Sequence, residues 1–490
     1  MVATVPPRFP DPLDPTPVQM TTLLHDLDAV DVRGDAASTE VTSIEFDSRR
    51  VQQGSLFCCV PGARTDGHLH AAEAVERGAH ALLCDHLLDL DVVQARVAPG
   101  AVRPAMASMA SAFYGHPSRS LRMVGVTGTN GKTTVTHLVQ SVLHRAGIPT
   151  GVIGTLAGER TTPEAPDLQR LLADFRTEGR EAVAMEVSSH ALTQHRVDAI
   201  VFEVAAFTNL SRDHLDHHGS MEAYYAAKAR LFEATRAETA VICVDDPWGA
   251  RLAASLDGPV VVPVRGSEAT EVVTGVGSTS FRWRGRTVTL PLTGRFNVSN
   301  ALVAATVATV LGVDEDGVAE GLARSEPVPG RMEVVVAEDP FSVIVDYAHT
   351  PAGLEVALSA ARDLAGPARV LCLFGCGGDR DQGKRPEMGE VSSRLADVVV
   401  LTSDNPRSED PLAIIGQIRA GLEGGAEVVV EPDRAEAVRL AVGMAGPGDV
   451  VLLAGKGHET TQSAAGHTRP FDDRVEARRA LAGRSGGATP

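Results

Sequence analysis

Short apolar runs alternate with amphipathic, helix-like stretches along most of the chain. Residues 121–128 (LRMVGVTG) are typical of a buried strand that enters a glycine turn, and residues 133–147 repeat apolar side chains at the helical period. The same alternation continues through residues 150–155, 167–179, 181–187, 200–210, 221–234 and 239–244. Strands that alternate with helices predict a mostly parallel sheet with helices on both faces.

The regions before and after this one show the same alternation. We therefore expect three α/β domains, at residues 20–118, 119–330 and 331–490. The segment PVPGRM, at 327–332, suits a hinge before the third domain because it contains two prolines and a glycine. Two β-rich runs, 268–277 and 279–292, predict a hairpin appended to the second domain.

Composition and charge exclude several classes of protein. Of the 490 residues, 43% are hydrophobic and 22% are charged, which is typical of globular domains, and no apolar run is long enough to span a membrane. The proline-rich residues 1–17 predict a disordered leader and lack the pattern of a signal peptide. A net charge of −18 argues against nucleic acid as a partner. We expect a cytoplasmic monomer that binds neither nucleic acid nor membranes.

The cysteines argue against disulfides and a zinc site, and the lysines indicate candidate functional residues. The six cysteines show no disulfide framework, and Cys372 and Cys376 lack a second ligand pair for zinc. Of the 45 basic residues only four are lysines, at positions 132, 228, 384 and 456, and three of them lie in glycine-rich segments. Lysine supplies a compact ammonium that can lose its proton, so all four are candidates for chemistry. The alternative is that these lysines are accidents of a composition depleted in lysine.

The segment VGVTGTNGKTT, at 124–134, joins a strand to a helix through a glycine-rich turn. In such a loop backbone N–H groups bind phosphates, Lys132 reaches the outer phosphates, and the Thr133 hydroxyl ligates Mg²⁺. The strict pattern has glycine six residues before the lysine, where this chain has Val126. The alternative is a glycine turn without a ligand.

Polar side chains follow two later strands of the same region. Glu186 is the last residue but one of the run EAVAMEV, where a carboxylate is placed to bind Mg²⁺, although a structural hydrogen-bonding role is the alternative. The segment FTNLSRDHLDHHG contains His214, which could complete a metal site or could be solvated on a loop. Lys228 lies in a predicted helix. If it is desolvated, its pKa falls and its neutral amine can capture CO₂ as a carbamate; if it is exposed, it has no such role.

Three segments of the third domain follow buried strands. They contain Arg380, the tetrapeptide DNPR at 404–407, and GKGHE at 455–459. Strand ends of a parallel sheet line one crevice, where arginines bind carboxylates and acidic side chains bind ammonium groups. The pattern favours an amino-acid substrate, and a simple chain reversal at Asn-Pro-Arg is the alternative.

The ordered set of motifs resembles the Mur ligase family, in its MurE-type branch. FDSRRV, TGTNGKTT, MEVSSHALTQHR, YYAAKARLF, VDYAHTP, GCGGDRDQGKRP, SDNPRSEDP and AGKGHET carry the resemblance, which covers about residues 43–475. It implies an α/β fold of three domains, with a central P-loop domain containing a parallel sheet and a C-terminal Rossmann-like domain. Only five residues separate Thr155 from Thr161, fewer than in many relatives, and Arg160 replaces an asparagine found in some of them.

The resemblance also implies a role for individual residues. It assigns catalysis to Lys132, Lys228, Glu186 and His214, and metal binding to Thr133, Glu186, His214 and Lys228 as a carbamate. ATP is assigned to Gly128, Thr129, Asn130, Gly131, Lys132, Thr133, Thr134, Asn300 and Asp346. A UDP-muramoyl-dipeptide is assigned to Ser48, Thr161, Thr162, Ser188, Gln194 and Arg196. Diaminopimelate is assigned to Arg380, Asp404, Asn405, Pro406, Arg407, Gly455 and Glu459.

The implied activity is ATP- and Mg²⁺-dependent amide formation in peptidoglycan precursor synthesis. The expected substrates are UDP-N-acetylmuramoyl-L-alanyl-D-glutamate and meso-2,6-diaminopimelate, joined through an acyl phosphate. Three alternatives remain at this point: a ligase that adds L-lysine, a folylpolyglutamate-like ligase, and a non-catalytic paralogue that binds muramoyl nucleotides.

Overall fold

The computed structural model describes residues 16–27, 31–62, 65–158, 160–335 and 341–485, so most of the proline-rich leader lies outside the described residues. The chain forms two compact units. One comprises the described residues of Met1–Gly125 with Ile148–Ala205 and Arg230–Glu238; the other comprises those of Val126–Gly147, Ala206–Ala229 and Thr239–Pro490. None of the helices in these described stretches is long and apolar enough to cross a membrane.

A five-stranded sheet lies near the N-terminus, with strand order β2-β7-β6-β5-β4. β4 to β7 run parallel and β2 pairs antiparallel with β7. The elements of this region are β1 Val18–Gln19, α1 Met20–Leu24, β2 Asp31–Arg33, β3 Glu40–Val41, β4 Ser43–Glu45, β5 Ser55–Cys58, α2 Ala71–Glu76, β6 Ala79–Cys84, β7 Val93–Arg96 and α3 Val102–Phe113. Strands and helices alternate in this region, as its sequence pattern predicts.

A six-stranded sheet follows, with strand order β13-β12-β11-β8-β10-β9. β9 runs parallel to β10, and β12 runs parallel to β13. Its strands are β8 Arg122–Thr127, β9 Thr150–Ile153, β10 Ala182–Glu186, β11 Phe202–Phe207, β12 Ala237–Cys243 and β13 Val260–Val264. The helices of this region are α4 Lys132–Arg145, α5 Ala165–Thr177, α6 Ser189–Thr193, α7 Leu215–His218, α8 Met221–Ala229, α9 Pro247–Ser255, α10 Phe296–Val310 and α11 Glu315–Ala323.

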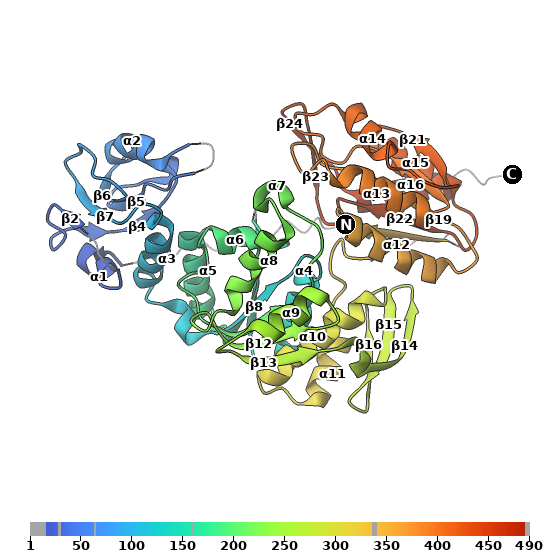
Figure 1. Ribbon diagram of the computed structural model, residues 1–490, viewed down its shortest axis with the longest axis horizontal. Coiled ribbons are helices and arrows are strands. Elements are labelled where there is room, and N and C mark those ends of the chain that lie inside the picture. Colours follow the sequence, from blue (N-terminus) through green and yellow to red (C-terminus); the bar gives the residue numbers. More distant parts are fainter. Residues whose placement is uncertain (1–15, 28–30, 63–64, 159, 336–340, 486–490) are drawn as a thin grey trace. The chain divides into compact units, whose positions relative to one another are not determined.

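The two predicted β-rich runs form a three-stranded sheet and not a two-stranded hairpin. β14 (Ala269–Gly275), β15 (Ser278–Trp283) and β16 (Arg286–Leu290) make an antiparallel three-stranded sheet (Figure 1). The second predicted run splits because Arg284 and Gly285 both adopt positive φ, at 45° and 80°, which is the backbone of a tight two-residue turn.

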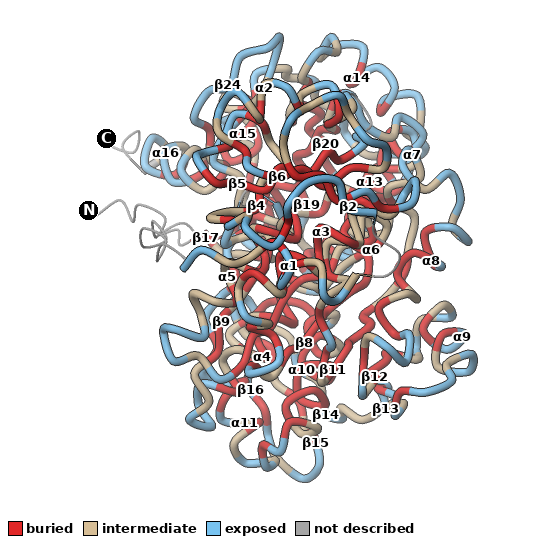
Figure 2. Tube along the Cα trace, turned by 90° about the vertical axis from the view of Figure 1, so that its left-hand side faces the viewer, coloured by how far each residue is buried: buried red, intermediate tan, exposed pale blue. Residues whose placement is uncertain are grey.

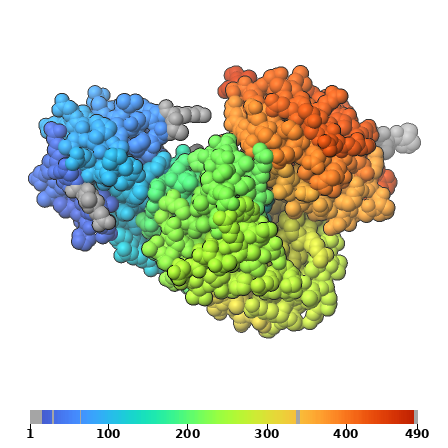
Figure 3. All heavy atoms as spheres, in the orientation of Figure 1, coloured from blue at the N-terminus to red at the C-terminus, as the bar shows by residue number. Residues whose placement is uncertain are grey.

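The C-terminal sheet has the strand order β17-β18-β22-β19-β20-β21 and is parallel except for β17. Apolar side chains of α12, α13 and α14 pack on one side of it and those of α15 and α16 on the other. Figure 2 shows β19 and β20 as buried, and Figure 3 draws this part of the chain in orange to red. The strands are β17 Glu333–Val335, β18 Ser342–Asp346, β19 Val370–Phe374, β20 Val398–Leu401, β21 Glu427–Val430 and β22 Val450–Ala454. The helices are α12 Pro351–Ala365, α13 Lys384–Leu395, α14 Pro411–Arg419, α15 Arg434–Met444 and α16 Asp473–Ser485, and a hairpin of β23 Thr461–Ala464 and β24 His467–Pro470 follows β22.

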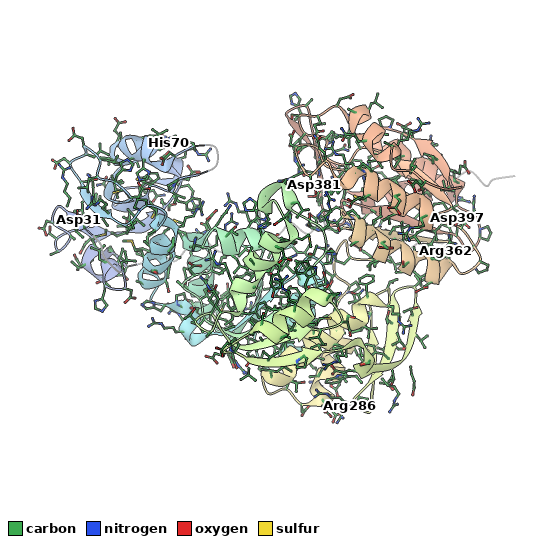
Figure 4. All side chains as sticks on the ribbon, viewed as in Figure 1. Asp31, His70, Arg286, Arg362, Asp381 and Asp397 are labelled. Carbon is green, nitrogen blue, oxygen red and sulfur yellow. The ribbon has the colours of Figure 1, made fainter. Side chains whose placement is uncertain are left out.

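Polar contacts hold the amino-terminal ends of β19 and β20, two inner strands of this sheet. Arg362 of α12 and Asp397, both labelled in Figure 4, form an ion pair with 2.5 Å between Nη2 and Oδ2. The same carboxylate oxygen accepts a hydrogen bond from the backbone N–H of Val370 over 2.7 Å. Asp397, which directly precedes β20, therefore connects α12 to the start of β19.

Candidate active site

The glycine-rich segment forms the predicted loop between β8 and α4. Gly128 and Gly131 have φ angles of 148° and 88°, which favour glycine. A methyl group on Gly128 would collide with the Thr208 hydroxyl, and one on Gly131 would collide with the amide oxygen of Asn300. The loop thus approaches its neighbours too closely for side chains at these two positions.

The loop is held by the segment that follows β11. The backbone N–H groups of Thr129 and Asn130 donate to the backbone and side-chain oxygens of Asn209, over 2.9 and 3.0 Å. The carbonyl of Asn130 accepts from the hydroxyl of Thr208 over 2.6 Å. The Thr129 hydroxyl lies 3.2 Å from the hydroxyl of Tyr224 in α8. Thr208 was not a predicted site residue, although its place directly after a buried strand is a signal that could have found it.

Lys132 and Lys228 meet at this loop. Lys132 donates from Nζ to the carbonyls of Gly128 and Thr129, over 3.0 and 2.9 Å. Lys228 donates from Nζ to the same Gly128 carbonyl over 2.8 Å and lies over the ring of Tyr224. Lys228 is only 1% exposed, which contradicts its interpretation as an ordinary exposed helical lysine. Burial, reinforced by the charge of Lys132, lowers the pKa of Lys228 well below its usual value.

His214 lies beside Asp213 in the same unit, at the start of α7. Burial lowers the pKa of His214 to about 4, which the Asp213 carboxylate opposes. Asp213 Oδ2 lies 3.3 Å from Nε2 of His214 and 3.9 Å from Nε2 of His349, a residue of the VDYAHTP segment that was not predicted as a site residue. A neutral imidazole keeps a lone pair for a cation, and the Thr133 hydroxyl, elsewhere in this unit, is an oxygen donor of the same predicted metal-binding set. This donor chemistry fits a divalent metal ion.

A cavity of about 400 Å³ opens beside the loop, entirely within this unit. Its polar wall includes predicted ATP-binding residues of the loop together with Asn300 and Asp346, and its apolar wall includes Val303 of α10 and Val356 of α12. Asn300 lies on α10 and donates to the side chain of Asn297 over 2.9 Å. The structure therefore brings the predicted residues Asn130, Gly131, Thr133, Thr134, Asn300 and Asp346 around one space.

Arg331 also lines this cavity, but the sequence indicated only a hinge there. Its Nη2 donates to the Thr133 hydroxyl over 3.0 Å, and its guanidinium lies 4.6 Å from the ring centre of Tyr347. Asp346 accepts hydrogen bonds from the backbone N–H groups of Met332 and Ala348, over 2.7 and 2.8 Å. Burial raises the pKa of Asp346, against the influence of Arg331.

Glu186 lies in the other unit, at the buried carboxyl end of β10. Its Oε1 accepts from the backbone N–H of Thr155 over 2.8 Å, and the hydroxyl of Thr155 lies 3.0 Å from that of Thr161. A side chain on Gly154 would collide with the Glu186 carboxylate. These contacts give Glu186 a structural role, and they leave a metal-binding role as a prediction.

The predicted dipeptide-binding residues form a connected cluster next to it. The Thr162 hydroxyl donates to the carbonyl of Glu186 over 2.8 Å and accepts from the Ser188 N–H over 3.1 Å. Arg196 donates to the Thr162 carbonyl over 2.7 Å and to the Gln194 side chain over 2.6 Å. Burial lowers the pKa of Arg196.

Glu164 anchors this cluster by ion pairs with three arginines. Arg103, Arg160 and Arg196 lie 2.9, 2.6 and 2.9 Å from its carboxylate oxygens. Three cations around one anion leave the cluster net positive, which suits an anionic ligand. Arg160, half of whose side chain is exposed, thus belongs to the cluster although it departs from the asparagine of some relatives.

Ser48 lies in the N-terminal part of the same unit, in a short 3-10 helix after β4. Its hydroxyl donates to Glu73 of α2 over 3.0 Å. Within the described residues no hydrogen bond joins it to the Thr162 cluster, so its predicted contact with a uridine group stays a prediction.

The residues predicted to bind an amino acid come together at the carboxyl ends of β19, β20 and β22. Asn405 donates to Glu459 Oε2 over 2.8 Å and, from the same amide nitrogen, to Asp404 Oδ1 over 3.4 Å. Arg407 has a φ of 51°, and its backbone pairs with the β23–β24 hairpin through Ser463 and Ala465. Its Nη1 donates to the Gly378 carbonyl over 2.5 Å. Arg407 therefore supplies a fixed cation among the same loops as the Asp404 and Glu459 carboxylates, at the strand ends that we call the amino-acid crevice.

The remaining predicted residues of the crevice are in the same loops. Pro406 accepts a backbone hydrogen bond from Glu409 over 3.0 Å, and Gly455 donates one to Asp346 over 3.1 Å. Arg380 is exposed on the loop after β19. Arg385, in the helix α13 that follows this loop, is fully buried and pairs with Glu409 at 2.8 Å. The sequence analysis did not include Arg385 among the site residues.

Comparison with known protein families matches three consecutive parts of the chain. Residues 40–120 match the Mur ligase family catalytic domain, residues 126–308 the Mur ligase middle domain, and residues 330–457 the Mur ligase glutamate ligase domain.

Curated relatives match nearly the whole chain. The UDP-N-acetylmuramoyl-L-alanyl-D-glutamate--2,6-diaminopimelate ligase of Streptomyces coelicolor is 44% identical, with 96% of this chain and 99% of the relative covered. The protein of the same name from Geobacillus kaustophilus is 45% identical, with 90% and 95% covered.

Solved structures agree with these matches. A UDP-N-acetylmuramoyl-L-alanyl-D-glutamate--2,6-diaminopimelate ligase superposes with a TM-score of 0.66 at 31% identity, covering 96% of this chain and all of the other. The MurF ligase of Thermotoga maritima, solved in complex with ADP, has a TM-score of 0.65 at 20% identity, covering 90% and 98%, which shows a shared fold.

Proposed function

This chain belongs to the Mur ligase family, in its MurE-type branch, and from that premise we propose that it adds meso-2,6-diaminopimelate to UDP-N-acetylmuramoyl-L-alanyl-D-glutamate. It is an ATP-dependent acid–amino-acid ligase that releases ADP and phosphate. The observation that carries the choice of amino acid is the Arg407 guanidinium, held at the Gly378 carbonyl among the same loops as the Asp404 and Glu459 carboxylates. One arginine and two acidic side chains suit a substrate that carries a second carboxylate, distant from the amine that reacts. Diaminopimelate has such a carboxylate and L-lysine does not.

The reaction must overcome the repulsion between two anions. The D-glutamate γ-carboxylate attacks the γ-phosphorus of ATP, the bond to ADP breaks, and an acyl phosphate forms. The amine of diaminopimelate then attacks the acyl carbon, loses a proton, and expels phosphate. We assign the positive charge at the phosphates to Lys132 and to the backbone N–H groups of the loop other than those of Thr129 and Asn130, which bond to Asn209.

The cavity beside the loop is the place we propose for ATP. Its polar wall suits phosphates and ribose, and its apolar wall at Val303 and Val356 suits a purine base. Arg331 is a further cation of this wall, next to Thr133. The ATP-binding set is Gly128, Thr129, Asn130, Gly131, Lys132, Thr133, Thr134, Asn300 and Asp346.

The donor set also supports Mg²⁺, which would neutralise charge on the transferring phosphate. Thr133, Glu186, His214 and a carbamate on Lys228 would hold it. The carbamate requires a neutral amine, and the buried position of Lys228 favours that form. Carbamate, carboxylate and hydroxyl oxygens are the hard ligands that Mg²⁺ prefers.

The other two substrates are assigned to separate sets of residues. We propose that the muramoyl dipeptide binds Ser48, Thr161, Thr162, Ser188, Gln194 and Arg196, and that diaminopimelate binds Arg380, Asp404, Asn405, Pro406, Arg407, Gly455 and Glu459. We further propose that the enzyme acts as a cytoplasmic monomer in cell-wall synthesis, and so in cell shape and division. Its proposed domains are residues 20–118, 119–330 and 331–490.

Phosphate release tests this function directly. The purified protein is supplied with Mg-ATP and UDP-N-acetylmuramoyl-L-alanyl-D-glutamate, and then with meso-diaminopimelate, L-lysine or no amine, and the product is weighed by mass spectrometry. We expect release with diaminopimelate and a product heavier by that residue. Release with L-lysine alone would contradict the assignment of the amino acid, and no release with either amine would contradict the ligase activity.

A further inference from the structure

Lys456 lies in the amino-acid crevice, yet neither its motif nor the proposed substrate contacts assign it a role. It is completely buried at the end of β22, in a molecule where lysine is rare. We infer that Lys456 is a positioning residue that holds Glu459 and Asn405 in the orientation that receives the amino group of the amino-acid substrate. This inference rests on the proposed function of the crevice.

Three oxygen atoms surround the Lys456 ammonium. Nζ lies 2.9 Å from Oε2 of Glu459, 3.3 Å from Oδ1 of Asn405, and 3.6 Å from Oδ1 of Asp404. These residues come from two loops, one after β20 and one after β22. Lys456 therefore joins the DNPR and GKGHE segments through a single buried charge.

The hydrogen bonds that the described residues make to the Glu459 carboxylate all reach one of its two oxygens. Oε2 accepts from both Lys456 and Asn405, over 2.9 and 2.8 Å. In the described part of the chain no group hydrogen-bonds to Oε1. The carboxylate is thus fixed by one oxygen and presents the other, which is the arrangement that receives an ammonium donor from outside.

The amide of Asn405 is fixed in the same way. Its oxygen accepts from Lys456 and from the backbone N–H of Ser463, over 3.3 and 3.0 Å, so its nitrogen must point to Glu459. Exchange of the amide nitrogen and oxygen would break all three contacts. Lys456 therefore also determines the orientation of this side chain.

The charge balance points to the same ligand. Asp404 and Glu459 carry two negative charges, and Lys456 supplies one positive charge among them. Arg407, the other cation of the crevice, is assigned to the distal carboxylate of the substrate, so one negative charge remains, and an ammonium group of the substrate matches it. A compact ammonium fits between three oxygens, whereas the larger planar guanidinium of arginine does not have that shape.

Steady-state kinetics of the full-length protein test this role. K456M removes the charge and keeps the length of the side chain. We expect the KM for diaminopimelate to rise by about tenfold or more, which is the effect of losing a charge-assisted hydrogen bond, with the KM for ATP changed less than about twofold. K456R, which keeps the charge, is expected to lie between the wild type and K456M.

A double-mutant cycle shows whether Lys456 acts through Glu459. E459Q alone should raise the KM for diaminopimelate, and K456M/E459Q should be no worse than the more severe single variant. The matched control is R439M, which breaks an exposed ion pair with Glu436, also three residues away, and should leave all constants unchanged. If K456M does not fold, the double variant, which leaves no unpaired charge from this pair, is compared with E459Q alone.

Three results would overturn the inference: an unchanged KM for diaminopimelate in K456M, equal increases in the KM values for diaminopimelate and ATP, or multiplicative effects in the double variant. The wild type separates this inference from the proposed function. A wild type inactive with diaminopimelate contradicts the proposed function, whereas an active wild type with an unaffected K456M contradicts only the role of Lys456.

Discussion

Lys132 and Lys228 donate hydrogen bonds to the same acceptor, the carbonyl oxygen of Gly128, over 3.0 and 2.8 Å. Two ammonium groups that share one oxygen repel each other, and the repulsion is strong because Lys228 is withdrawn from water. The burial and the neighbouring charge both lower the pKa of Lys228. Its amine is therefore the one that loses a proton and becomes able to react with CO₂.

We expect K228A to lower kcat by about 100-fold or more, because the variant removes a charge-stabilising group at the phosphates. Added formate or acetate should restore part of the rate by supplying the missing carboxylate-like oxygens. Phosphate release with all three substrates measures both effects. The control is R251A, which removes an exposed arginine of α9 that pairs with Glu222 of α8, and which should keep the wild-type rate. Turnover of K228A at the wild-type rate would contradict the carbamate.

Arg407 should set the preference between diaminopimelate and lysine. R407M removes the fork that we assign to the distal carboxylate, so the KM for diaminopimelate should rise by about 10- to 100-fold. L-Lysine lacks that carboxylate, so any slow reaction with it should be unaffected. R407K, which keeps a charge without the fork, should restore little of the lost affinity. Equal losses with both amines would show that Arg407 does not read the distal carboxylate.

The sequence predicted the site best where polar or glycine-rich segments directly follow buried strands. The loop at Gly128–Thr134 and the crevice around Asp404–Arg407 were predictable because buried strands direct the following residues to one edge of a sheet. The structure confirms both placements, and it excludes an exposed Lys228.

Residues whose roles depend on long-range contacts were not predictable in this way. Arg331 reaches Thr133, and His349 lies near Asp213, across long separations in the sequence. The helix α13 was not predicted because its helical period rests on only three apolar side chains, those of Met388, Val391 and Leu395, in a sequence that is otherwise polar and contains Pro386 and Gly389.

A buried ion pair lies at the carboxyl end of β22, next to the loop that contributes Glu459 to the crevice. Arg434 and Asp473 are both fully buried and bonded at 2.7 and 2.8 Å, and Arg434 also donates to the carbonyl of Ala454, where β22 ends. R434M leaves a buried carboxylate without a partner, so we expect the free energy of unfolding to fall by about 3–5 kcal/mol.

Urea unfolding followed by circular dichroism measures this loss. R434M/D473L, which replaces both charges with apolar groups, should recover much of it, because no charge is then left unpaired. The exposed pair of Arg394 and Glu355 is the matched control, and R394M should cost at most about 1 kcal/mol. Equal losses in the free energy of unfolding of R434M and R394M would contradict the claim that burial makes the Arg434–Asp473 pair the more costly one to break.

Glu45 should make the stability of the N-terminal region depend on pH. Burial raises the pKa of this carboxyl to about 7, although Arg50 lies 3.2 Å away and opposes the shift. The folded protein therefore holds the proton more tightly than the unfolded chain, whose carboxyl has its ordinary pKa of 4.5. The stabilisation is complete below pH 4.5 and is lost as the pH rises through 7, a change of at most about 3 kcal/mol.

E45Q stays neutral at every pH and removes this dependence. We expect the thermal midpoint of the wild type to fall relative to that of E45Q between pH 5 and pH 8, as measured by differential scanning fluorimetry at fixed ionic strength. A constant difference across this range would mean that Glu45 is already ionised at pH 5, and that the ion pair with Arg50 outweighs the cost of burial.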